Sequence, residues 1–102
     1  MKRILFASLS VLATLATPAF ADADLAKAKN CLACHATDTK LVGPSYKDVA
    51  KKYAGDAKAA DMLATKIVKG GVGTWGQIPM PANAQVSEAE AKKLATWVLG
   101  MK

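Results

Sequence analysis

The chain has 102 residues, a length that suits one domain, and its 14 basic and 8 acidic residues give a formal net charge of +6. Its two cysteines and single histidine exclude a structural zinc site, which takes four such ligands. The positive charge does not predict nucleic acid binding, because the one arginine stands at position 3 and the lysines are spread along the chain.

Residues 1–21 have the three parts of a secretory signal peptide: a basic start, an apolar stretch, and the small-x-small site Ala19-Phe20-Ala21. A membrane anchor is the alternative, but a span needs roughly 20 apolar residues, and this shorter run ends at Pro18. We therefore expect cleavage of residues 1–21, localisation in the periplasm without stable membrane insertion, and one mature domain over residues 22–102. That domain keeps 12 lysines against 8 acidic residues, a balance that suits acidic partner surfaces.

The first predicted helix begins at Asp22 or Asp24, either of which can cap it, and carries Cys31-Leu32-Ala33-Cys34-His35 in its last turn. On a helix, the second cysteine and the histidine share a face with the first. C-x-x-C-H in an exported chain is the attachment signature of haem c, in which both thiols become thioethers and the imidazole binds iron. A disulfide or a thioredoxin-like redox pair is the alternative, but that motif expects strands, and alternating patterns are scarce here.

Three further helices and no strand are predicted. The second runs from Pro44 to Gly55 and the third from about Asp56 to Gly70, with proline and glycine marking their limits. The fourth begins at the capping box Ser87-Glu88-Ala89-Glu90. Apolar residues recur at helical spacing along these segments: Tyr46, Val49, Ala50, Tyr53, Met62, Leu63, Ile67, Leu94, Trp97, Val98 and Met101. The fold class is therefore all-α, with about four helices.

Residues 70–83 form an irregular stretch that is long for so small a domain, and such loops are usually functional or disordered. Trp75, Ile78 and Met80 are costly residues to leave in water. We therefore expect the loop to fold over the cofactor.

Met80 is the candidate for the second iron ligand, because the chain has no second histidine and the prolines on both sides of Met80 restrict its backbone. Ordinary packing is the alternative for Met80. Met62 and Met101 continue helical stripes, where methionine more often fills gaps in a core. A thioether ligand favours ferrous iron, so ligation by His35 and Met80 predicts an oxidising electron carrier with no iron position left for a substrate.

Three parts of the chain match a family pattern: the motif at residues 31–35, the step Val42-Gly43-Pro44, and the segment Trp75-Gly76-x-Ile78-Pro79-Met80-Pro81 with Asn83. Together they resemble the short bacterial class I cytochromes c, specifically the cytochrome c-551/c-552 group, over essentially all of residues 22–102. The resemblance implies a small class I cytochrome c fold of about four helices wrapped around one covalently bound haem. Two departures are Ala82, where relatives often carry a second proline, and Lys66, where they often carry arginine.

The resemblance also implies roles for particular positions. The Pro44 carbonyl would accept a hydrogen bond from the axial imidazole, and the Trp75 indole would donate to a haem propionate, with simple packing as its alternative. The Asn83 amide would lie near the sulfur of Met80. Lys66 would offer a propionate a point charge in place of the fork of an arginine.

We therefore predict a soluble periplasmic monomer of the respiratory chain that is not an enzyme and carries one electron on haem c and its iron. Its partners would be redox proteins, such as a cytochrome complex as donor and a terminal oxidase, nitrite reductase or peroxidase as acceptor. The alternative is a haem enzyme or gas sensor with an open iron position. The predicted docking patch comprises Val42, Pro44, Ile78 and Pro81, with Lys27, Lys29, Lys40 and Lys47 as candidate rim charges.

Overall fold

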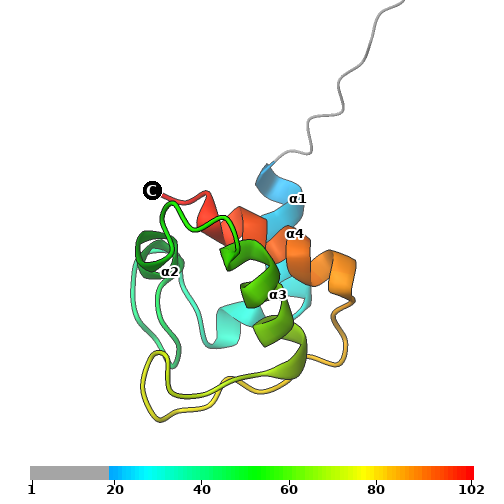
Figure 1. The fold of residues 1–102 in the computed structure, drawn as a ribbon. Coiled ribbons are helices and arrows are strands. Elements are labelled where there is room, and N and C mark those ends of the chain that lie inside the picture. Colours follow the sequence, from blue (N-terminus) through cyan, green and yellow to red (C-terminus); the bar gives the residue numbers. More distant parts are fainter. Residues whose placement is uncertain (1–18) are drawn as a thin grey trace, which may run out of the picture.

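The computed structural model describes residues 19–102, which fold into four α-helices joined by loops (Figure 1). The helices are α1 (Ala19–Ala28), α2 (Tyr46–Lys52), α3 (Ala59–Lys69) and α4 (Glu88–Leu99), with a short 3-10 helix η1 (Cys31–Ala33) after α1. The described residues contain no strand, only two isolated bridges, so the all-α prediction is confirmed. No helix within residues 19–102 is long and apolar enough to cross a membrane.

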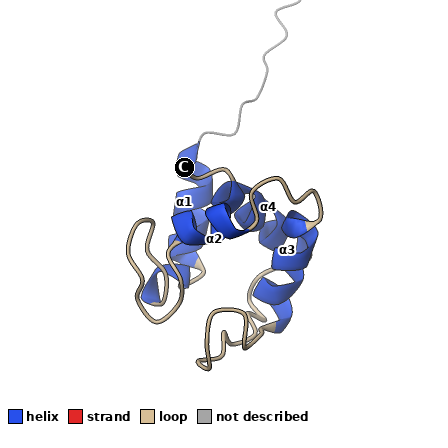
Figure 2. Ribbon diagram, turned by 60° about the vertical axis from the view of Figure 1, so that its left-hand side comes forward, coloured by secondary structure: helices blue, strands red, loops and turns tan. Residues whose placement is uncertain are grey.

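Helix α4 is the central element, because α1, α2 and α3 all pack against it (Figure 2). Two buried apolar clusters form on it. One joins Ala26, Val86, Ala91 and Leu94, and the other joins Tyr46, Val49 and Val98. Leu94 and Val98 are 3% and 8% exposed, and their spacing of one helical turn places both on the inner side of α4, as its apolar stripe predicts.

The first helix differs from the prediction at both ends. Helix α1 begins at Ala19, so neither Asp22 nor Asp24 caps it. It ends at Ala28, and Asn30 follows with φ 64°, a left-handed conformation that asparagine tolerates and that stops a helix. Cys31 therefore begins η1 and Cys34 directly follows it, so neither cysteine lies in the last turn of the first helix. Of the predicted signal peptide, residues 1–18 lie outside the described residues.

The next two helices are shorter than predicted. Helix α2 begins at Tyr46, because the side chain of Ser45 accepts a hydrogen bond from the Asp48 N–H and caps it, whereas Pro44 lies before the cap. Helix α3 begins at Ala59 rather than near Asp56, whose carboxylate accepts from the Lys58 N–H at 2.9 Å in the preceding turn. Short polar side chains that bond nearby backbone favour turns over helix, which shortens both elements.

The predicted capping box of α4 is confirmed. The Ser87 hydroxyl accepts from the Glu90 N–H at 3.1 Å, and the Glu90 carboxylate accepts from the Ser87 N–H at 3.0 Å. These hydrogen bonds, with Lys29 nearby, lower the pKa of the exposed Glu90 carboxyl. Glu90 therefore bonds the start of α4 as the ionised carboxylate rather than as the neutral acid.

Replacing Ser87 by alanine is expected to lower the free energy of unfolding by about 1 kcal/mol, because the Glu90 N–H loses its acceptor.

Glu90 should make the stability depend on pH, because its pKa is lower in the folded state than in the unfolded state. Its contribution to the free energy of unfolding is complete above the pKa of the unfolded state and is lost as the pH falls through the pKa of the folded state. Glu90→Gln should therefore flatten the decline in stability on acidification. Urea unfolding of both variants at neutral and acid pH checks this, with Ser87→Thr as the control that keeps the cap.

Candidate functional site

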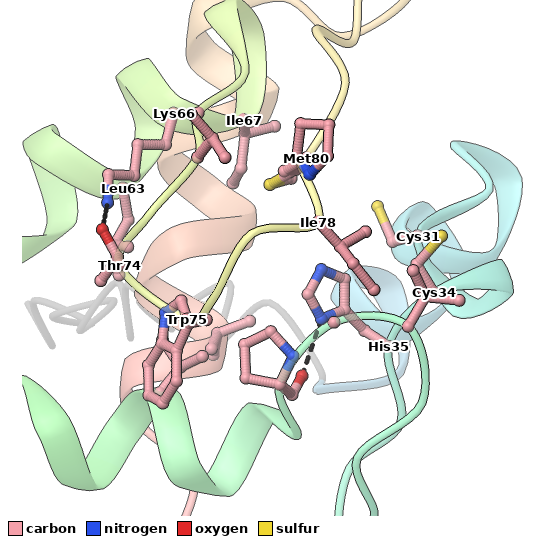
Figure 3. Close-up of a pocket in the computed structure, with 18 of the residues that line it drawn as sticks. Cys31, Cys34, His35, Leu63, Lys66, Ile67, Thr74, Trp75, Ile78 and Met80 are labelled. Atoms are coloured by element: carbon pink, nitrogen blue, oxygen red, sulfur yellow. Dashed lines mark hydrogen bonds between the residues drawn. The ribbon is translucent and has the colours of Figure 1, made fainter.

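A cavity of about 280 Å³ lies between the segment of η1 and α2 on one side and α3 with the loop of residues 70–83 on the other (Figure 3). Its walls are mostly apolar, and its size is near the lower end of that of small-molecule sites, which span about 300 to 1,000 Å³. The structure brings six of the seven predicted site residues to this cavity: Cys31, Cys34, His35, Pro44, Trp75 and Met80. Asn83 does not line it.

Both cysteines are free thiols at the cavity wall. Burial, with a smaller contribution from Cys34, raises the pKa of the Cys31 thiol, so this group is neutral before any reaction. Within residues 19–102 no cluster of histidine, cysteine and acidic side chains could hold a metal ion by itself. The thiols therefore suit covalent attachment of an organic cofactor better than ligation of zinc.

The imidazole of His35 is oriented by the backbone behind it. Its Nδ1 lies 2.7 Å from the carbonyl oxygen of Pro44, the partner that the resemblance implies. A carbonyl can only accept, so Nδ1 carries the proton and Nε2 keeps a free lone pair, the form that binds a metal. The Gly43 N–H donates to the Cys34 carbonyl at 2.8 Å, which ties this segment to the cysteine motif.

The ring of Tyr46 packs against the imidazole of His35. The two rings stack with centroids 5.4 Å apart, and Tyr46 meets Trp97 edge to face at 5.3 Å. Tyr46 is 5% exposed, and burial raises the pKa of its hydroxyl, so the ring is neutral. The orientation of His35 thus depends on α2 and α4 as well as on its own loop.

Gly43 leaves no room for a side chain, because a Cβ atom there would lie 2.5 Å from His35 Cε1. Gly43→Ala is therefore expected to displace the imidazole and to lower the free energy of unfolding by about 1–3 kcal/mol, the usual cost of overpacking. Denaturant unfolding and the chemical shifts of the His35 ring measure both effects. Gly100→Ala is the control, since a Cβ there would meet its nearest atom at an ordinary 3.5 Å; equal behaviour of the two variants would contradict the prediction.

The segment that carries Met80 is fixed by backbone pairing. The Gly71 N–H donates to the Met80 carbonyl at 3.1 Å, and the Met80 N–H donates to the Gly71 carbonyl at 2.8 Å. Gly70 has φ 79°, and a Cβ atom there would lie 2.6 Å from the Met80 carbonyl oxygen, so only glycine fits. The loop is folded over the cavity, and Met80 enters from the side of Ile67, opposite His35 (Figure 3).

Trp75, Lys66 and Asn83 occupy three different positions relative to the cavity. Trp75 lines it while remaining 40% exposed, and Lys66 lines it while its ammonium donates to the Thr74 hydroxyl at 2.7 Å. The amide nitrogen of Asn83 donates to the carbonyls of Ile67 at 2.8 Å and Pro81 at 3.3 Å. The bond to Ile67 fastens the loop to α3.

This donor set fits a covalently attached haem. Two thiols lie at one edge of an apolar cavity, an oriented imidazole nitrogen faces it, and a thioether enters from the other side. The sequence alone did not reveal that Gly43 and Tyr46 help to hold the imidazole. The signal for Gly43 was its place directly before Pro44, whereas Tyr46 looked like any other apolar helix residue.

Comparisons with known proteins agree with this arrangement. The family model described as Cytochrome c matches residues 23–102. The chain is 65% identical over 79 residues to cytochrome c-551 of Azotobacter vinelandii, covering 78% of this chain and 95% of that one. It is 52% identical to cytochrome c-552 of Hydrogenobacter thermophilus over the whole of both chains. The crystal structure of Nitrosomonas europaea cytochrome c552 superposes with a TM-score of 0.77 at 59% identity, covering 78% of this chain and 99% of that one.

Proposed function

Because the chain belongs to the cytochrome c family, and so is a small electron-transfer protein with covalently bound haem c and its iron, we propose that it is a periplasmic carrier with His35 and Met80 as axial ligands. Cys31 and Cys34 form the two thioether bonds. The observation that supports this most directly is that an oriented imidazole and the methionine of the loop of residues 70–83 reach one apolar cavity from opposite sides.

The protein residues set the properties of this centre. Haem c, when bound, supplies a one-electron ferric/ferrous couple. The hydrogen bond from His35 Nδ1 to Pro44 fixes the ring, and the apolar walls and the thioether of Met80 favour the less charged, ferrous form. A fixed ligand on each face also keeps geometric change small, which suits electron transfer and leaves no position for a substrate.

The mouth of the cavity supplies a docking surface. Val42, Val72 and Ile78 line the cavity and are 51%, 66% and 67% exposed. An apolar centre with a polar rim is the usual anatomy of a protein interface. We propose that redox partners contact the protein here. The electron donor would be a cytochrome complex, and the acceptor an oxidase, nitrite reductase or peroxidase.

The four lysines selected from the sequence differ in their surroundings. Lys29 pairs with Glu90 at 3.6 Å, and Lys47 pairs with Asp38, so both have acidic neighbours of their own. Lys40, which was among the lysines selected from the sequence, and Lys66, which was not, both line the cavity. These two ammonium groups are the better candidates for attracting an acidic partner, with a rate that falls as salt increases.

Export follows from the predicted signal peptide over residues 1–21, which would release a domain of residues 22–102 into the periplasm. The N-terminal sequence of the protein purified after osmotic shock tests cleavage and compartment together.

A reduced-minus-oxidised spectrum with a redox titration tests the ligation. We expect low-spin spectra in both states, a sulfur-to-iron absorption band in the ferric form, and slow, incomplete binding of carbon monoxide by the reduced form. Rapid and complete binding of carbon monoxide at neutral pH, without the sulfur band, would support the open-site enzyme or sensor instead.

A further inference from the structure

The two walls of the cavity are joined mainly through α4. Helices α2 and α3 both pack on α4, but among the described residues no Cα atom of α2 lies within 8 Å of one in α3. Leu63 of α3 packs against the cluster of Tyr46, Val49 and Val98, so the walls also meet near α4. At the mouth of the cavity, farther from α4, a tie between α2 and the loop of residues 70–83 has to come from a contact other than this packing.

The hydrogen bonds of this loop do not supply that contact. In the described part of the chain they run to α3, as from Lys66 to Thr74 and from Asn83 to Ile67, stay among loop residues, or join Asn83 to Gln85 and Val86 just after the loop. None of them reaches α2. A loop with no tie to α2 could swing away from His35 together with Met80.

Lys52 supplies a contact between α2 and the loop of residues 70–83. It is the last residue of α2, and its ammonium lies 5.6 Å from the centre of the Trp75 ring and 5.8 Å from that of Tyr53. An ammonium within about 6 Å of an aromatic ring is attracted to its face. The cation therefore lies between one ring attached to α2 and one ring attached to the loop of Met80.

We propose that Lys52 is a positioning residue that clasps the loop of residues 70–83 to α2 through Trp75 and so holds the sulfur of Met80 in place. The second half of this statement rests on the proposed ligation by Met80. Lys52 does not line the cavity, and none of the ion pairs within residues 19–102 includes it. Its aromatic contacts are thus the interactions that account for its position.

The test compares Lys52→Met with Lys51→Met in the haem-loaded protein. Both variants lose one charge at neighbouring exposed positions at the end of α2, but only Lys52 lies over the rings. We expect exchange of the Met80 amide hydrogen to rise about two- to fivefold in Lys52→Met, the factor that an exposed cation–π contact supplies. The imidazole concentration that half-displaces the ferric sulfur band should fall by the same factor. Lys52→Arg should behave like the parent protein.

The outcomes separate the clasp from the ligation. Equal effects in Lys52→Met and Lys51→Met, or effects that disappear in high salt, would overturn the clasp and leave only a general charge effect. If the parent protein lacks the sulfur band while exchange still rises in Lys52→Met alone, the clasp stands and ligation by Met80 fails.

Discussion

Met80→Ala is expected to leave haem attached while lowering the reduction potential by on the order of 0.1 V or more, a fraction of the roughly 0.8 V range that axial ligands set. The reason is that the thioether favours the ferrous form, and its removal lets water or another harder ligand favour the ferric form. The same variant should bind carbon monoxide rapidly when reduced. Spectroelectrochemical titration and carbon monoxide mixing provide the two measurements.

Met62→Ala is the matched control for Met80→Ala. Met62 is half-buried on α3 but does not line the cavity, so its removal should cost some stability and leave the potential and the carbon monoxide reaction unchanged. An unchanged potential in Met80→Ala would reject Met80 as a ligand. A similar fall in both variants would point to general loosening of the fold.

Replacing both Cys31 and Cys34 by alanine is expected to abolish covalent attachment, with each single variant keeping one thioether. The tether holds the cofactor at an effective concentration on the order of millimolar, so without it stability should depend on added haem. The effect should be large, since a fold of this size has a small core of its own. Haem staining on a denaturing gel and unfolding at several haem concentrations measure these effects.

Leu32→Ala controls for disturbance of the motif itself. Leu32 lies between the cysteines, is 44% exposed and does not line the cavity, so its truncation should leave attachment intact. Haem that survives denaturation in the double cysteine variant would show that attachment uses other residues.

The sequence was most informative where a short pattern of residues favours a single local structure. The capping box at Ser87 fixed the start of α4, because both of its hydrogen bonds are made within one turn. The spacing of the cysteine motif and the prolines around Met80 likewise selected residues that the fold brings to one cavity.

What the sequence did not reveal depends on contacts between distant segments. The left-handed Asn30 ends α1 early, although nothing in the apolar pattern marks this stop. The hydrogen bond from His35 to Pro44 was expected from a family resemblance, not from the residues alone. Asn83 bonds to Ile67, a partner 16 positions away that only the folded loop brings close.

The central place of α4 has a consequence for how the protein assembles. This helix follows the other three in the chain. Both halves of the pocket lack their common support until α4 has docked. Until then the two thiols would stay open to a cofactor, which leaves an interval for attachment before the fold closes around it.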